Sequence, residues 1–158
     1  MWWYVFIVAL LLALMALLIW WNSTQDNTPE IIELTDEWCD AVTMGTPADT
    51  ANLFCEKSIL IGTVSQTIRD TEESIQSYFD YFMGLPGLQI LERNYNITRI
   101  NSTTYVNNAF ITWVYDGVEP FVARMTFVYE YTSRKWCLFL LHSSVLPDRV
   151  DELRFGKK

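Results

Sequence analysis

The strongest constraint on the fold lies in the last third of the chain, where apolar and polar residues alternate. Two segments, FVARMTFVYEYT and KWCLFLLHSS, are joined by a short polar turn, and side chains along a strand point alternately to its two faces. Arg124 therefore shares a face with Val122 and Val128, whereas His142, the only histidine, shares one with Leu138. An Arg or His buried without a partner costs several kcal/mol. These two positions therefore predict a pocket in a curved sheet.

Helix signals precede a longer series of strand signals. Asp70 and Glu73 have the spacing of a capping box, and prolines follow two other capping residues. One helix is expected from Pro29 to Gly45, a shorter one from Pro47 through Phe54, and a third from Asp70 or Thr71 to Gly84. Strands are expected over residues 58–61, 88–100, 105–115, 120–131 and 135–144, with Asp116-Gly117 as a hairpin turn.

This order of elements predicts the fold class. Helices followed by a meander of long antiparallel strands indicate an α+β domain in which helices cover one face of a strongly curved antiparallel sheet. The 158 residues, of which 15% are aromatic, are enough for one such domain with a substantial core. We expect a transmembrane anchor, a linker, one domain and a polar tail, over residues 1–21, 22–28, 29–148 and 149–158.

The first 21 residues contain no charged side chain. At about 1.5 Å per residue, the stretch between the Trp2-Trp3 and Trp20-Trp21 pairs covers most of a hydrocarbon core of roughly 30 Å, and paired aromatics are typical of the two membrane interfaces. A cleaved signal peptide is the alternative. Because there is no basic segment at the start and bulky residues occupy the expected cleavage end, we favour an uncleaved single-pass anchor.

The soluble part gives weak signals about its compartment. Three sequons, at Asn22, Asn96 and Asn101, would carry glycans only if the domain faced the lumen or the exterior, which is the orientation we expect. The cysteines are odd in number and lack a metal-binding or redox spacing. They are either buried free thiols or one disulfide with one thiol left over, and the sequence does not choose the pair.

The charge of the chain excludes one class of partner. The net charge is -8, and no Lys or Arg precedes Lys57, so there is no basic surface to bind a nucleic-acid backbone. Nothing in the sequence indicates a metal site or a cofactor.

Residues 31–147 resemble the association (hub) domain of calcium/calmodulin-dependent protein kinase II and its stand-alone relatives, in the NTF2-like, SnoaL-like superfamily. The resemblance rests on the order and spacing of four segments: IIELTDEWCDAV, TIRDTEESIQSYFDYF, ARMTFVYEY and KWCLFLLHSSVLP. It implies an NTF2-like (cystatin-like) cone, association through the sheet into a homodimer or larger ring, and a polar pocket that takes small carboxylates in some relatives. The kinase motifs and a basic amphipathic helix are missing, so we expect neither phosphoryl transfer nor direct calmodulin binding.

The resemblance and the strand pattern together suggest a ligand-binding pocket. Arg69 matches the position of a cavity arginine, and its guanidinium could hold a carboxylate; the alternative is a surface salt bridge with Glu72 or Glu73. Arg124 could instead pair with Glu92, and His142 could instead be a core histidine bound to backbone. Trp38 and Tyr78 are expected to pack between helix and sheet and also to wall the pocket.

Two functions follow from this pattern. The first is a membrane-anchored, non-catalytic scaffold that self-associates and binds a small anionic ligand between Arg69, Arg124 and His142. The alternative is a ketosteroid-isomerase-like or SnoaL-like enzyme acting on a small carbonyl compound. Such an enzyme needs a base, and the segment ILIGTVSQTI offers no carboxylate, so we expect binding and assembly rather than catalysis.

Overall fold

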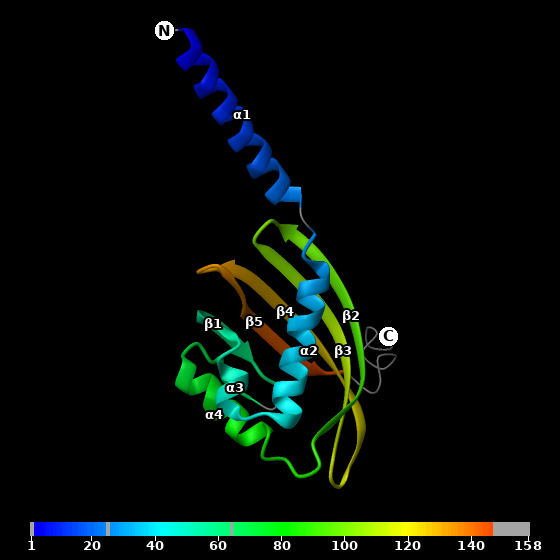
Figure 1. Ribbon diagram of the computed structural model, residues 1–158. Helices are drawn as coiled ribbons and strands as arrows, with labels where there is room; N and C mark the ends of the chain where they lie inside the picture. The colour runs from blue at the N-terminus through cyan, green and yellow to red at the C-terminus, as the bar shows by residue number, and fades with distance from the viewer. Residues whose placement is uncertain (1, 25, 64, 147–158) are drawn as a thin grey trace, which may run out of the picture.

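The computed structural model describes residues 2–24, 26–63 and 65–146. A long apolar helix, α1 (Trp2–Thr24), precedes a domain with three helices packed against one sheet (Figure 1). The helices of the domain are α2 (Thr28–Met44), α3 (Pro47–Ala51) and α4 (Glu72–Phe82), and the strands are β1 (Phe54–Ile61), β2 (Gln89–Asn101), β3 (Thr104–Tyr115), β4 (Val118–Thr132) and β5 (Lys135–Val145). The expected α+β architecture is confirmed.

The sheet is mixed rather than wholly antiparallel. Its strand order is β1-β5-β4-β3-β2, and β1 runs parallel to β5 while the other neighbours are antiparallel. A parallel pair needs a long crossover; here the chain between β1 and β5 contains α4 and the whole β2-β3-β4 meander. The long strands curve around the helices, which all lie on the concave side (Figure 1).

Local capping chemistry starts α3 and α4 close to the expected places, whereas α2 begins after Asn27 without a side-chain cap. Thr46 and Asp49 form a reciprocal capping box at α3, as the sequence suggests. The box at α4 joins Thr71 and Ser74 instead of Asp70 and Glu73. A threonine hydroxyl serves this role as well as a carboxylate does, so the helix starts one residue later than the Asp70 box would set.

The core fills the space between the helices and the concave face of the sheet. Trp38 of α2 lies at its centre and makes edge contacts with Phe79 of α4, Trp113 of β3 and Phe127 of β4, with ring centroids 5.1–6.3 Å apart. Edge-to-face contacts of this kind add to the stabilisation from buried area. This cluster ties α2 and α4 to the two central strands.

Polar links fix α2 against the sheet. The Arg93 guanidinium of β2 pairs with Asp36 at 2.9 Å and with Asp40 at 2.6 Å, and the Tyr95 hydroxyl donates to Asp36 at 2.7 Å. Deeper in the core, Thr35 lies 3.0 Å from the Tyr129 hydroxyl. Because these bonds are directional, they set the rotation of α2 as well as its distance from the sheet.

One disulfide joins β1 to β5, between Cys55 and Cys137, and Cys39 is a free, fully buried thiol. The alternative of one bridge with one thiol left over therefore holds.

The Cys39 thiol is expected to resist alkylation in the folded protein. Burial raises its pKa from 9.0 to about 11, which lowers its thiolate fraction at pH 8 roughly a hundredfold. Because the unfolded thiol ionises first, Cys39 also makes the native state less stable as pH rises from about 9 to about 11. Mass spectrometry after iodoacetamide treatment should show no modification of the native protein and a single modification in denaturant without reductant.

The control is the same digest after reduction, which should show three modified cysteines because the two sulfur atoms of the disulfide are then released. Three modifications without reductant would contradict the disulfide.

Candidate functional site

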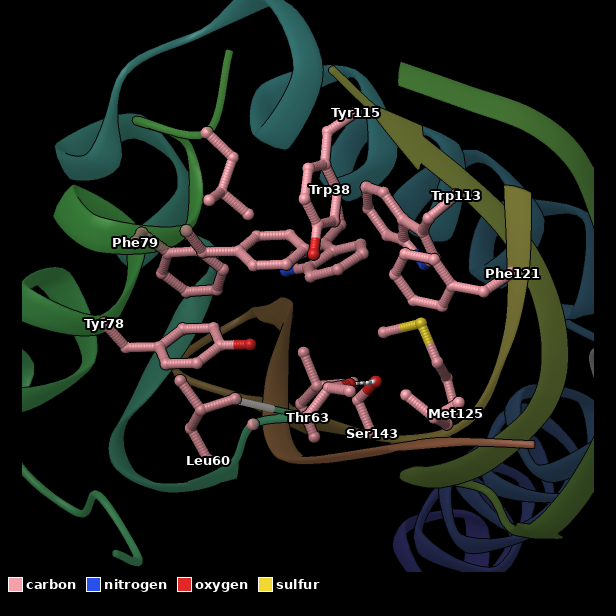
Figure 2. A pocket seen from close by; sticks show the side chains of 15 residues that line it. Trp38, Leu60, Thr63, Tyr78, Phe79, Trp113, Tyr115, Phe121, Met125 and Ser143 are labelled. Carbon is pink, nitrogen blue, oxygen red and sulfur yellow. Dashed lines mark hydrogen bonds between the residues drawn. The ribbon is translucent and has the colours of Figure 1, made fainter. Parts of the chain in front are cut away.

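A cavity of about 150 Å³ lies between the concave face of the sheet and helices α2 and α4. Seven of its fifteen lining residues are aromatic, and Figure 2 shows their rings arranged around an open centre. The lining residues come from six elements and from the loops after β1 and α4, and are Trp38, Leu60, Gly62, Thr63, Tyr78, Phe79, Phe82, Leu85, Trp113, Tyr115, Phe121, Met125, Leu141, Ser143 and Val145.

The position of the Tyr78 ring depends on a glycine. A Cβ on Gly62, just after β1, would lie 2.2–2.7 Å from the outer ring atoms and hydroxyl of Tyr78. Only a residue without a side chain lets the ring pack on the backbone there. The phenol is thus directed toward the centre of the cavity, as Figure 2 shows.

The Arg69 guanidinium packs on the Tyr78 ring. It lies 5.6 Å from the centre of the ring, and its Nη1 donates to the carbonyl of Ser74 at 2.7 Å. A cation at this distance from an aromatic face is attracted by it. Arg69 therefore positions a cavity residue without lining the cavity itself, and neither Glu72 nor Glu73 is its partner.

The polar groups of the lining side chains are four hydroxyls and two indole N–H groups. Thr63 and Ser143 are hydrogen-bonded to each other, and the hydroxyls of Tyr78 and Tyr115 point into the space (Figure 2). Within the described part of the chain, the buried indole N–H of Trp38 has no hydrogen-bond partner. The described lining residues include no Asp, Glu, His, Lys or Arg. The cavity can therefore exchange hydrogen bonds, but it has no charge with which to hold an ion.

Arg124 lies outside this cavity. It is exposed on the convex face of the sheet, where its guanidinium lies 3.3 Å from the Ser144 hydroxyl of the neighbouring strand. Arg124 does share a strand face with Val122 and Val128, as predicted, but this face is the outer one. The expectation that Arg124 looks into a pocket is therefore wrong, and Ser144, not Glu92, is its neighbour.

His142 is also exposed on the outer face, because the pairing of β4 with β5 contains a bulge. Val128 pairs with Leu140 and Tyr129 with Leu138, which leaves Phe139 as an extra residue. One extra residue exchanges the faces of every side chain beyond it. Leu138 consequently points inward and His142 outward, so the two do not share a face as predicted.

The structure thus separates the five expected pocket residues. Trp38 and Tyr78 line the cavity, Arg69 lies behind Tyr78, and Arg124 and His142 lie across the sheet. The expected carboxylate site between the two arginines and the histidine is not assembled.

The cavity residues that the sequence did not reveal include Gly62, Thr63, Trp113 and Ser143. Period-two alternation could have placed Trp113 on the inner face, because it is in phase with Ala109 and Ile111. Ser143 could not be found in that way, since the bulge reverses the phase of β5 before it.

Two of the three expected glycosylation sites can be located. Asn96 is exposed on β2, and Asn101, also exposed, lies at the β2–β3 turn where its side chain accepts from the Thr103 backbone at 2.8 Å. The side chain of Asn22 lies outside the described residues. Modification of these asparagines remains a prediction.

Comparison with known proteins shows which family has this fold. The model of the SnoaL-like domain family matches residues 31–148, so the chain belongs to the SnoaL-like family. A search of curated proteins found no match.

Solved structures agree with this placement. A Xanthomonas campestris protein, whose name assigns it to the calcium/calmodulin-dependent protein kinase II association domain, is 29% identical, with a TM-score of 0.66 over 78% of this chain and 91% of its own. A domain with a cystatin-like fold from Nostoc punctiforme is 17% identical, with a TM-score of 0.69 over 84% of each chain. A hexachlorocyclohexane dehydrochlorinase is 11% identical, with a TM-score of 0.65 over 74% of this chain and 83% of its own. The latter two likenesses concern the fold alone, and the resemblance inferred from the sequence is confirmed.

Proposed function

We propose that this chain is a membrane-tethered, non-catalytic module that self-associates through the convex face of its sheet. The observation that carries this proposal is the outer face of β3, β4 and β5, which no other described element covers, because α2, α3 and α4 all pack on the other side (Figure 1). Apolar side chains are prominent on it, and Phe110 at its centre is 51% exposed. The outward-facing residues are Val106, Asn108, Phe110, Thr112, Val122, Arg124, Thr126, Val128, Glu130, Leu140, His142 and Ser144.

The charge distribution supports a second copy of the chain as the occupant of this face. The chain has a net charge of -8, yet Glu130, near the end of β4, is the one carboxylate among these outward-facing residues. Two copies can therefore meet here with less of the repulsion that the rest of an acidic surface would produce. The Xanthomonas relative is named for an association domain and is covered over 91% of its length, which favours the same behaviour in this chain.

The membrane helix fits this role. α1 is long and apolar enough to cross a membrane, and none of its Trp3–Trp21 segment is buried against the domain. Tethering copies in one plane raises their effective concentration, so a weak interface is enough to form clusters. The Cys55–Cys137 disulfide and the exposed Asn96 and Asn101 favour a domain on the lumenal or extracellular side.

The composition of the cavity supports a role without catalysis. Proton abstraction requires a base close to the substrate, and the described cavity wall offers only hydroxyl groups, indoles and apolar side chains. The first test is light scattering coupled to size-exclusion chromatography of the full chain in detergent, over a dilution series. A dimer or larger ring that dissociates on dilution supports the proposal, and a monomer at every concentration contradicts it.

The variant Phe110→Glu is expected to weaken this association at least tenfold. Phe110 lies directly opposite Arg124 in the β3–β4 ladder, so the new carboxylate can pair with that arginine in the monomer and leave the fold intact. In a face-to-face assembly the same charge would be buried, which is strongly unfavourable. The dissociation constant from the dilution series measures the effect.

Tyr81→Glu is the matched control, because Tyr81 is an exposed aromatic residue on α4, away from the convex face. It should leave the dissociation constant unchanged. Equal association of Phe110→Glu and the unmodified chain would exclude this face as the interface.

A further inference from the structure

We infer that the cavity binds a small uncharged molecule with a single ring and a hydroxyl or carbonyl group. This inference is independent of self-association, since the cavity and the proposed interface lie on opposite faces of the sheet. It also differs from the anionic ligand expected from the sequence.

The size of the cavity selects a single ring. Its volume is about 150 Å³, comparable to that of an apolar cavity of about 150 Å³ that takes up benzene. Phe79, Phe82, Trp113 and Phe121 supply flat walls around this space. Aromatic rings pack well against such walls in stacked or edge-to-face arrangements. A larger fused ring system would have to displace core side chains.

The neutrality of the wall selects an uncharged ligand. None of the described lining residues carries a formal charge at neutral pH, so a carboxylate or an ammonium group would lose its hydration without gaining a counter-charge. The nearest guanidinium, that of Arg69, is already engaged by the Tyr78 ring and the Ser74 carbonyl.

The hydroxyl groups select a ligand with one polar atom. Tyr115 directs its phenol into the space, and the Thr63–Ser143 pair lies beside it (Figure 2). Each hydroxyl can donate or accept. Trp38 also lines the cavity with a buried N–H that lacks a partner among the described residues, and a bound oxygen atom beside it would remove that unfavourable state. A hydrocarbon alone would use none of these groups.

Three probes of equal ring size separate these requirements. Toluene has only the ring, benzyl alcohol adds a hydroxyl group, and benzoate replaces it with a charge. Calorimetric titration of the full chain in detergent should give the tightest binding for benzyl alcohol, about fivefold tighter than toluene, the effect of one neutral hydrogen bond. Benzoate should bind at least tenfold more weakly than benzyl alcohol.

Two variants test whether the measured heat of binding comes from the cavity. Val145 lines the cavity and is 45% exposed, so the lining reaches the surface at this residue. Val145→Trp should fill the cavity from this side and abolish binding. This variant in the same detergent also subtracts partitioning of the probes into micelles. Tyr115→Phe should reduce the preference for benzyl alcohol over toluene, whereas Tyr81→Phe on the exposed face of α4 should not.

The outcomes separate the two proposals. Tighter binding of benzoate than of benzyl alcohol, equal heats from Val145→Trp and the unmodified chain, or no binding of any probe would each overturn the inference. Light scattering on the same samples reports self-association, so a failure of ligand binding cannot be mistaken for a failure of assembly.

Discussion

Replacing Cys55 and Cys137 together by alanine is expected to lower the free energy of unfolding by about 2–4 kcal/mol, one of the two largest effects we predict. The bridge joins residues 82 positions apart, so its loss gives the unfolded chain many more conformations. It also frees β1, which pairs only with β5 at the edge of the described sheet. Denaturant titration of the full chain, followed by intrinsic fluorescence, measures the change.

Cys39→Ala is the control, because it removes a buried thiol that forms no cross-link. Cys39→Ala should lower the free energy of unfolding less than the double replacement does. Reductant should destabilise this variant as much as the unmodified chain. If reductant left the stability of the unmodified chain unchanged, the disulfide would have no stabilising role.

Trp38→Ala is the other substitution with a large expected effect, about 3–5 kcal/mol in the free energy of unfolding. Trp38 is 2% exposed and contacts aromatic rings from α4, β3 and β4. Truncation leaves a void that these rings cannot all close. The void would also merge with the existing cavity and the Trp38 N–H would be lost, so the preference for benzyl alcohol over toluene should fall. Thermal and denaturant unfolding measure the first effect, and calorimetry the second.

Tyr81→Ala provides the comparison, since it removes an aromatic side chain that is 63% exposed. Surface substitutions of this kind change stability by roughly 0.5 kcal/mol or less. A similar loss for both variants would mean that Trp38 does not hold the helices against the sheet.

The elements were predictable because their signals are local. Prolines and threonines at helix starts, and alternation along β2, β3 and β4, depend only on neighbouring residues, and the observed bounds differ from the expected ones mostly by one or two positions. The main exceptions are the end of α3 and the start of β1: α3 ends at Ala51 instead of Phe54, and β1 begins at Phe54 instead of residue 58. There a helical and an extended pattern overlap, and pairing with β5 decides between them.

The candidate site was harder to predict, because it depends on contacts between distant residues. The parallel pairing of β1 with β5 brings Thr63 to Ser143 and Cys55 to Cys137, and neither pair has a local signature. The family resemblance gave the right fold, but the strand alternation placed Arg124 and His142 in a pocket that they do not reach. Trp38 and Tyr78 were recovered because an apolar stripe on a helix points to the core wherever the strands lie.

The bulge at Phe139 determines which chemistry this fold can offer. With the extra residue, β5 presents Ser143 to the interior and His142 to solvent. A strand one residue shorter at this point would exchange the two and turn an imidazole toward the phenol of Tyr78. The presence or absence of one residue in β5 therefore decides whether this fold has a neutral binding cavity or a cavity with a group that can transfer protons. The change requires no new side chain and no change in the helices.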